Sequence, residues 1–195
     1  MKLAALILTV ALQAATLTPH PERSQVKTPV YLVNEDVYLT DLQIEFMAKK
    51  LTKKMFADIG VGIEWQPGRP AVGFRLDYSI LITVTKSDPK IGSPHTFGAA
   101  EPFGKNQITI FFRRIERHSP ESTAFLLSYV LAHEITHVLE GLDYHAPTGI
   151  MRSYWDADDF ARIYQCQLRF TPYDIRLIQL GLVSRTSKEA TGGRD

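Results

Sequence analysis

The sequence has few cysteines, no excess of charge of one sign, and no apolar run long enough to span a membrane. Cys166 is the only cysteine among 195 residues, which excludes a disulfide within the chain. If the protein is exported, its stability must come from its core and from any bound metal. We expect Cys166 to be a buried, unreactive thiol. The net charge of +1 gives no reason to expect a nucleic acid or an anionic membrane as a partner.

A short apolar run is present at the N-terminus. Lys2 precedes the run Leu3–Leu12, and small residues follow at positions 14–16. A basic start, a short apolar centre and a small-residue end are typical of a secretory signal peptide, with a buried N-terminal helix as the alternative. The run is too short to span a bilayer comfortably. We therefore expect a signal peptide over residues 1–18 and a secreted or periplasmic protein, with no stable membrane association after its removal.

The composition of the chain, 45% apolar and 22% charged, is that of one soluble globular domain with enough residues to bury a core. After the signal peptide we expect a polar lead-in over residues 19–28 and a single domain over residues 29–183. The residues from 184 to 195 are polar and should form a flexible tail.

The pattern of apolar residues predicts both strands and helices. Four segments rich in β-formers predict strands: Val30–Val33, Val61–Trp65, Leu76–Thr85 and Gln107–Phe112. Helical spacing, caps and breakers predict four helices: Asp41–Asp58 behind a Thr40 cap, Ser119–Glu140, Asp156–Gln165 and Pro172–Leu182. Strands and one helix therefore come first and helices follow. This is an α+β layout, in which a cleft between the two parts is the natural place for a site.

The second predicted helix has the clearest signals at its ends. Ser119 is expected to cap it, with Pro120 at its first position, and Gly141 should end it in the left-handed conformation. Its apolar positions predict a buried stripe, made of Leu127, Leu131, Ile135, Val138 and Leu142. Thr171 and Asp174 resemble a capping pair for the last helix.

This second helix carries the motif His133-Glu134-x-x-His137. One helical turn separates the two histidines, so their side chains lie on one face and can bind the same metal ion. Zinc favours such nitrogen ligands, and a catalytic zinc site uses three protein ligands and a water. The ion acidifies that water and polarises a carbonyl. Glu134 is placed to accept the proton of the water and pass it to a leaving amine.

The motif and its surroundings resemble those of the metzincin zinc peptidases. Their pattern is HExxHxxGxxH with a later methionine turn, and this chain has His133-Glu134-x-x-His137-x-x-x-Gly141-x-x-x-His145 and then Gly149-Ile150-Met151. Phe97–Ala100 and the segment 108–112 resemble the sheet above such an active site, and Phe170–Gln179 resembles the closing helix of matrixins. The chain is also similar to short exported bacterial proteins that combine HExxH, a GIM segment and a following tryptophan, here Trp155.

The resemblance implies a zincin-like α+β fold. A small mixed sheet, a backing helix and an active-site helix would be followed by a helical C-terminal subdomain with the methionine turn. It also implies a Zn²⁺ cofactor, and Met151 as a hydrophobic floor beneath the metal; an ordinary core methionine is the alternative for Met151. Tyr154 and Trp155 would shape the pocket for the side chain after the scissile bond. Tyr144 or Tyr154 could donate to an oxyanion, although a structural role is the commoner one for such tyrosines.

The spacing departs from the metzincin pattern, because Gly141 comes one residue late and His145 two residues late. Asp143 stands where that family places its third ligand. We favour His145 as the third ligand, with His133 and His137, because imidazole suits zinc and the shifted glycine indicates that the whole loop is reset. Asp143 is the first alternative, and an acid of the next helix (Asp158 or Asp159) is the second.

These observations predict an exported zinc metallopeptidase, most simply an endopeptidase that acts on a peptide or protein. An extended substrate would pair with an edge strand of the sheet, and we expect Gln107–Phe112 to be that strand. One alternative is another zinc hydrolase that acts on short peptides or cell-wall peptide. A second is a non-catalytic, zinc-stabilised binding module, against which Glu134 and the lack of cysteines near the motif argue. His95 and His118, outside the motif, are expected to be surface or loop residues.

Overall fold

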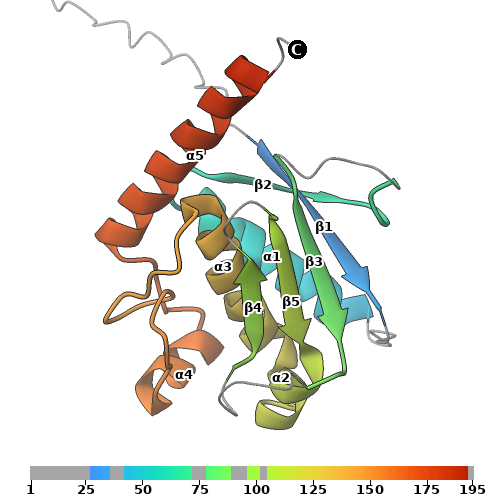
Figure 1. The fold of residues 1–195 in the computed structure, drawn as a ribbon. Coiled ribbons are helices and arrows are strands. Elements are labelled where there is room, and N and C mark those ends of the chain that lie inside the picture. The colour runs from blue at the N-terminus through green and yellow to red at the C-terminus, as the bar shows by residue number, and fades with distance from the viewer. Residues whose placement is uncertain (1–26, 36–41, 72–77, 89–95, 102–104, 193–195) are drawn as a thin grey trace, which may run out of the picture.

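The computed structural model describes residues 27–35, 42–71, 78–88, 96–101 and 105–192, with the side chains of the last segment up to residue 187. These residues form one five-stranded sheet and five helices (Figure 1). The strands are β1 (Lys27–Asn34), β2 (Gly62–Gln66), β3 (Ile80–Thr85), β4 (Gly98–Glu101) and β5 (Gln107–Phe111). The helices are α1 (Leu42–Ala57), α2 (Phe112–His118), α3 (Thr123–Glu140), α4 (Ala157–Tyr164) and α5 (Pro172–Gly192).

The sheet is mixed and mostly parallel, with the strand order β2-β1-β3-β5-β4. β1 pairs in parallel with β2 and β3, and β3 pairs in parallel with β5. β4 pairs antiparallel with β5, with Ala99 opposite Thr109. The prediction that Gln107–Phe112 forms an edge strand is therefore wrong, because β5 lies between β3 and β4. Among the described strands, the shorter β4, which contains Gly98, Ala99, Ala100 and Glu101, forms that edge of the sheet instead.

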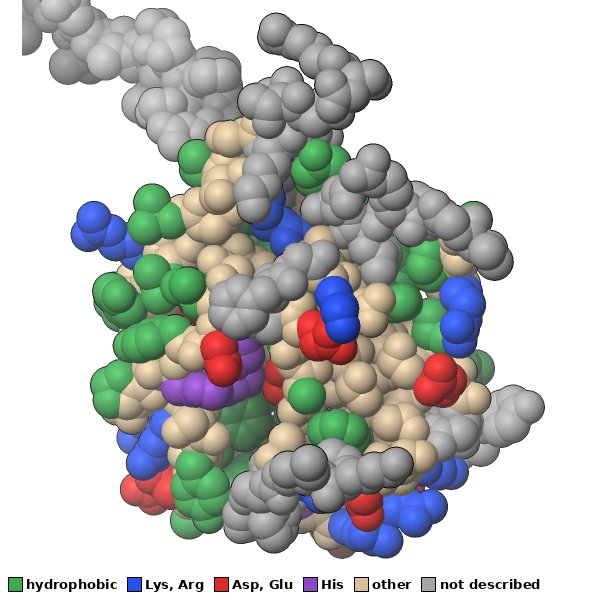
Figure 2. Space-filling model, viewed as in Figure 1, with side chains coloured by type: hydrophobic (Ala, Val, Ile, Leu, Met, Phe, Trp, Pro, Cys, Tyr) green, Lys and Arg blue, Asp and Glu red, His purple; other side chains and the backbone are tan. Residues whose placement is uncertain are grey.

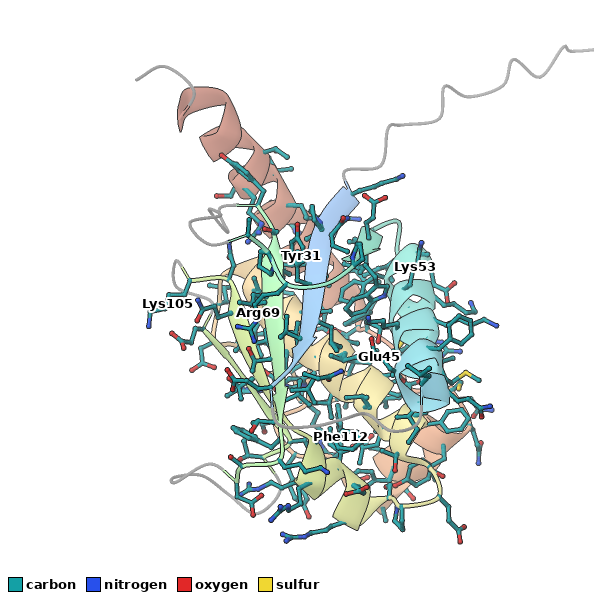
Figure 3. All side chains as sticks on the ribbon, turned by 90° about the vertical axis from the view of Figure 1, so that its right-hand side faces the viewer. Tyr31, Glu45, Lys53, Arg69, Lys105 and Phe112 are labelled. Atoms are coloured by element: carbon teal, nitrogen blue, oxygen red, sulfur yellow. The ribbon has the colours of Figure 1, made fainter. Side chains whose placement is uncertain are left out.

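Helices α1 and α3 pack side by side against one face of the sheet (Figure 3). Almost every residue of α3 is buried, because the sheet, α1 and α5 all contact it. Thr52 on α1 donates a hydrogen bond to the carbonyl of Ser128 on α3 at 3.1 Å, which fixes the two helices relative to each other. The predicted stripe of α3 is confirmed except for Leu142, which follows the helix and is 40% exposed. The helix that carries the motif is therefore held rigidly in the core.

The start of α3 differs from the expectation. The helix begins at Thr123 and not at Ser119, and Phe112, expected to be strand, begins the unpredicted helix α2. The hydroxyl of Ser119 is hydrogen-bonded to that of Tyr164 on α4, so it does not cap the helix. Its carbonyl instead accepts from the hydroxyl of Thr123 at 2.8 Å. Tertiary contacts have thus displaced a local capping signal.

Several other helix ends agree with the sequence. Gly141 ends α3 with φ of 65° and its amide donates to the carbonyl of His137, as predicted. Gly60, with φ of 78°, follows α1, whereas its expected cap Thr40 lies outside the described residues. The pair Thr171 and Asp174 is confirmed, since each side chain accepts a hydrogen bond from the other's backbone amide.

The last helix is longer than expected. α5 continues to Gly192, through most of the segment from residue 184 that was expected to be a flexible tail. Arg185 holds this extension to the body of the protein, donating to the side chain of Asn106 at 3.0 Å and to the carbonyl of Val138.

Two expectations concern cysteine and the membrane. Cys166 is half-buried, not buried, and has a positive φ of 55° just after α4. The expected signal peptide, residues 1–18, and the lead-in lie outside the described residues. Among the helices that are described, none combines the length and the apolar character needed to cross a bilayer.

Candidate metal centre and active-site cleft

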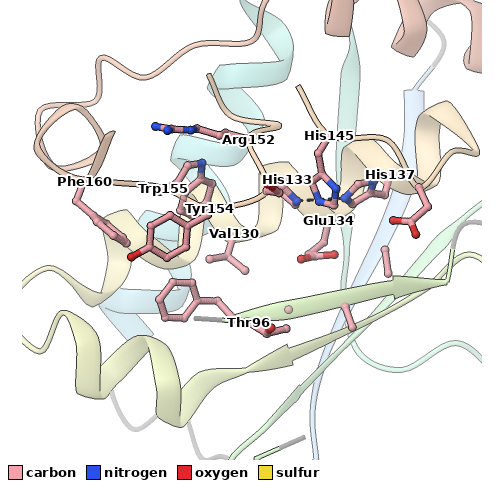
Figure 4. A pocket seen from close by; sticks show the side chains of 16 residues that line it. Thr96, Val130, His133, Glu134, His137, His145, Arg152, Tyr154, Trp155 and Phe160 are labelled. Atoms are coloured by element: carbon pink, nitrogen blue, oxygen red, sulfur yellow. Dashed lines mark hydrogen bonds between the residues drawn. The ribbon is translucent and has the colours of Figure 1, made fainter. Parts of the chain in front are cut away.

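Three histidines converge at the C-terminal half of α3. His133 and His137 project from one face of the helix, and His145 reaches them from the loop that follows (Figure 4). One ring nitrogen of each lies within 4.8 Å of those of the other two. The structure thus brings together the three residues that the sequence singled out as zinc ligands, including the one that departs from the metzincin spacing.

Backbone carbonyls fix the orientation of two of these rings. His133 donates from Nδ1 to the carbonyl of Ile150 at 2.8 Å, and His137 donates from Nδ1 to the carbonyl of Leu142 at 3.1 Å. A carbonyl can only accept, so in both rings the proton is on Nδ1 and the lone pair is on Nε2. Fixing the tautomer in this way is typical of histidines that bind metals.

The two free Nε2 atoms face each other at 3.1 Å. Two lone pairs this close repel each other unless a proton or a cation lies between them. Nitrogens that share one tetrahedral zinc, with bonds of about 2.0–2.1 Å, lie about 3.3 Å apart. The donor set and its spacing therefore fit a zinc ion.

The electrostatic environment keeps these imidazoles neutral. Burial, helped by the neighbouring His137, lowers the pKa of His133 to about 3. Burial also lowers the pKa of His137. A metal ion binds the neutral form of histidine, so both rings are in the binding form at neutral pH.

The alternative third ligands are placed differently. Asp143 lines the same cleft, but its carboxylate is not part of the converging group. The Asp159 carboxylate is hydrogen-bonded to Arg152 and to the backbone at the start of α4. Asp158 is exposed on α4. Among the described residues, the geometry therefore favours His145.

Glu134 lies between α3 and β4, and only 7% of it is exposed. Burial raises its pKa to about 8, although a hydrogen bond with the backbone of Ala100 acts in the opposite direction. Gly98 gives the side chain its room, since a Cβ added there would lie 2.8 Å from both Cγ and Oε1 of Glu134. Sequence reasoning assigned no role to Gly98. The signal at this position was the resemblance of Phe97–Ala100 to the sheet above a metzincin active site, and Gly98–Ala100 do lie in strand β4.

The loop after the histidines is tied to the core at Gly149-Ile150-Met151. Gly149 has φ of 81°, and a Cβ there would lie 2.6 Å from the carbonyl oxygen of Arg169. The same oxygen accepts from the amide of Ile150 at 3.0 Å, and the carbonyl of Met151 accepts from Ala146 at 2.8 Å. Met151 is fully buried. This segment thereby places the carbonyl that orients His133.

The histidines and Glu134 open into a cleft of about 460 Å³. β4 forms one wall, and the loop and turn that follow α3 form the other (Figure 4). The end away from His137 is lined mainly by apolar and aromatic side chains, namely Phe97, Val130, Tyr154, Trp155 and Phe160. Of the two tyrosines considered for an oxyanion, Tyr154 lines this cleft. Tyr144 instead packs edge-on against Tyr173.

One positive charge lies at the aromatic end, and it is compensated. Arg152 lines the cleft and forms ion pairs with Asp156 and Asp159. The hydrogen bond with Arg152 holds the pKa of Asp156 below its usual value. The cleft therefore has an apolar end without an uncompensated charge among its described residues.

The sequence predicts a surface or loop position for two histidines outside the motif. His118 is on the surface, as expected, with its ring against Phe97 and Phe160, whereas His95 lies outside the described residues.

Comparison with known proteins finds a likeness in structure but none in sequence. No protein-family model matches the sequence, and no curated protein is similar to it. The structure is similar to that of archaemetzincin from Methanopyrus kandleri, with a TM-score of 0.51 and 14% sequence identity. The match covers 84% of this chain and 98% of that one. It shows that the chain has an archaemetzincin-like fold.

Proposed function

We propose that this protein is a zinc-dependent peptidase. The observation that carries the proposal is the convergence of three imidazole nitrogens beside the buried carboxyl of Glu134, which is on the same helix as His133 and His137. This group lies in a cleft open to a substrate. The fold, which is similar to that of archaemetzincin, agrees with it. A site that served only to stabilise the fold would have no use for the acid or for the open cleft.

In this proposal His133, His137 and His145 hold the zinc ion, which when bound supplies a Lewis acid that acidifies water and polarises a carbonyl. Glu134 accepts a proton from the attacking water and returns it to the leaving amine. Burial raises the pKa of Glu134, which makes its carboxylate a stronger base, and a cation bound beside it would favour the ionised form that accepts the proton. Met151, fully buried, would lie beneath the metal, as in metzincins.

The open edge of β4 is the proposed binding surface for an extended peptide. Among the described strands β4 pairs only with β5, so its other edge is free to add a strand. Antiparallel pairing is the more stable arrangement. β4 runs from the aromatic end of the cleft toward His137 (Figure 4). An antiparallel substrate therefore places its residues before the scissile bond near His137 and those after it at the aromatic end.

The aromatic end then selects the residue that follows the scissile bond. Its walls are mainly apolar and aromatic, and the charge of Arg152 is compensated by two aspartates. A charged side chain placed there would lose its hydration without gaining a partner. We therefore propose a preference for large apolar side chains at this position.

Export is a further part of the proposal. It is supported by the basic residue, the apolar run and the small residues at the start of the sequence. N-terminal sequencing of the protein recovered from the periplasm or the medium of an expressing bacterium tests it. A first residue close to position 19 supports cleavage there, and retention of Met1 in the cytoplasm would contradict it.

The test of the peptidase activity is cleavage of a peptide library, read by mass spectrometry. The zinc-loaded protein is compared with its Glu134→Ala and Glu134→Gln variants. Cuts made only by the unaltered protein would support the activity and the role of Glu134, and large apolar residues directly after the cuts would support the proposed preference. Zinc bound by all three proteins, with no cut by any, would contradict a broadly acting peptidase and favour a narrow substrate or a binding role.

A further inference from the structure

Apolar side chains are exposed next to the histidines, on the surface formed by α5 and the loop after α3. Tyr173 is 54% exposed and Leu180 is 58% exposed, and Leu142 in the loop is also well exposed. In Figure 2 apolar side chains gather beside the purple histidines, on the side where Figure 1 shows α5. We call this surface the apolar ridge and define it by five residues: Leu142, Tyr144, Tyr173, Leu177 and Leu180.

The direction in which the ridge faces follows from the packing of α5. Asp174, Ile178 and Gly181 are buried, and they form the inward stripe of the helix. A Cβ at Gly181 would lie only 2.0 Å from the carbonyl oxygen of Leu139, so the two helix backbones are in direct contact there. The ridge residues on α5 each precede one of these inward residues by one position. They therefore form a neighbouring stripe along the flank of the helix.

A ring contact shows which flank this is. Tyr173, at the start of the stripe, packs against Tyr144 with the ring centroids 5.5 Å apart. Tyr144 directly precedes His145, and Asp143 on its other side lines the cleft. Leu142 donates its amide to the carbonyl of His137 at 3.3 Å, so it lies at the end of α3. The ridge is thus continuous with the part of the cleft that holds the histidines.

Single exposed apolar residues are common on protein surfaces, but a contiguous group beside a binding cleft marks an interaction site. None of the five ridge residues carries a charge at neutral pH, so the surface fits an apolar partner. The antiparallel direction proposed for the substrate takes its N-terminal part past His137, toward this loop. The occupant that fits both the position and the chemistry is therefore a part of the substrate itself.

We propose that the apolar ridge binds an apolar segment of the polypeptide substrate, several residues before the scissile bond. This inference rests on the proposed peptidase function and adds a second determinant of substrate choice, remote from the reacting atoms. The protein would then favour polypeptides that carry two apolar groups, one directly after the scissile bond and one further toward the N-terminus.

The experiment measures binding apart from turnover. Zinc-loaded protein carrying Glu134→Gln is titrated into two fluorescein-labelled peptides, followed by anisotropy. The peptides share the residues around the scissile bond, and their N-terminal extensions carry either leucine and phenylalanine or serine. Burying one or two side chains on the ridge should make the apolar peptide bind about tenfold more tightly. Adding Tyr173→Ser and Leu180→Ser should remove this difference and leave the affinity for the serine peptide unchanged.

A matched control comes from α1, where Leu42 is 79% exposed and Phe46 is 67% exposed, outside the cleft lining. Leu42→Ser with Phe46→Ser should leave both affinities unchanged. Thermal unfolding of each variant verifies that it is folded, which is expected because all four side chains are exposed.

Three results would overturn the inference. The first is equal affinity for the two peptides, found together with cleavage of library peptides by the protein with Glu134 intact. That result would leave the peptidase function standing and refute only the role of the ridge in binding. The second is a dimer, seen by analytical ultracentrifugation, that Leu180→Ser dissociates, because the ridge would then be covered by a second copy. The third is a zinc-loaded protein that neither cleaves nor binds any peptide, which would overturn the proposed function and the inference with it.

Discussion

Gly98 begins β4 directly against the side chain of Glu134, and the substitution Gly98→Ala tests whether this close approach positions the proposed base. The added Cβ would lie 2.8 Å from Cγ and from Oε1 of Glu134, and 3.0 Å from Cδ. Ordinary van der Waals contact begins at 3.4 Å. The carboxyl, the strand or both must therefore move.

The size of the effect follows from that overlap. The strand is held through the pairing of Gly98 with Ile110 on β5, so the side chain of Glu134 should take up most of the movement, roughly half an ångström or more. A misplacement of about 1 Å in a reacting group can cost about 100-fold in rate. We expect kcat for peptide cleavage to fall by about 10- to 100-fold. Zinc affinity should be unchanged, because the three atoms nearest to the added Cβ all belong to Glu134 and none to a histidine.

The assay measures kcat on a peptide taken from the library screen, with zinc content determined by mass spectrometry on the same samples. Ala57→Ser is the control, since it adds one atom to an exposed residue of α1 that does not line the cleft and should change kcat by less than about threefold. A Gly98→Ala protein with full zinc content and a kcat within twofold of the unaltered value would refute the reasoning.

The third ligand is tested by zinc competition with a chromophoric chelator. His145→Ala should weaken zinc binding at least 100-fold, whereas Asp143→Ala should change it less than threefold, and the reverse order would reassign the ligand. Burial and the nearby Asp174 carboxylate raise the pKa of Glu140 to about 8. The folded state then keeps a proton on Glu140 that the unfolded chain loses, so the contribution of Glu140 to stability should fall as the pH rises from about 4.5 to 8. Glu140→Gln should flatten this fall in unfolding temperature, and parallel pH profiles would contradict the assignment. Gly149→Ala should destabilise the fold by about 1–3 kcal/mol in denaturant titrations, and a loss below about 0.5 kcal/mol would show that the turn can relax.

Features with a local physical cause were predictable from the sequence. The spacing of His133 and His137 needs only a helix, and the left-handed end at Gly141 needs only the absence of a side chain. The pair of Thr171 and Asp174 follows the rules of capping. In each case the residues that determine the structure lie within a few positions of one another.

Features that depend on distant contacts were not predictable in the same way. The Gly98–Glu101 segment has little strand propensity. It forms β4 because its backbone pairs with that of β5 and because its small residues leave room for the side chain of Glu134. Ser119 is a favourable capping residue, but its hydroxyl is hydrogen-bonded to that of Tyr164 on α4. The third ligand could not be chosen from spacing alone, because the path of the loop after Gly141 is fixed by hydrogen bonds to other parts of the chain.

Two of the three clustered histidines, His137 and His133, are oriented by the carbonyls of Leu142 and Ile150, and these acceptors belong to the backbone. No point substitution can delete them, so the orientation of both rings is specified by the course of the chain and not by the identity of any side chain. Divergent sequences can therefore keep this centre while sharing almost nothing around the histidines. An insertion or deletion in the loop would shift both acceptors, so changes of length should be rarer there than changes of residue.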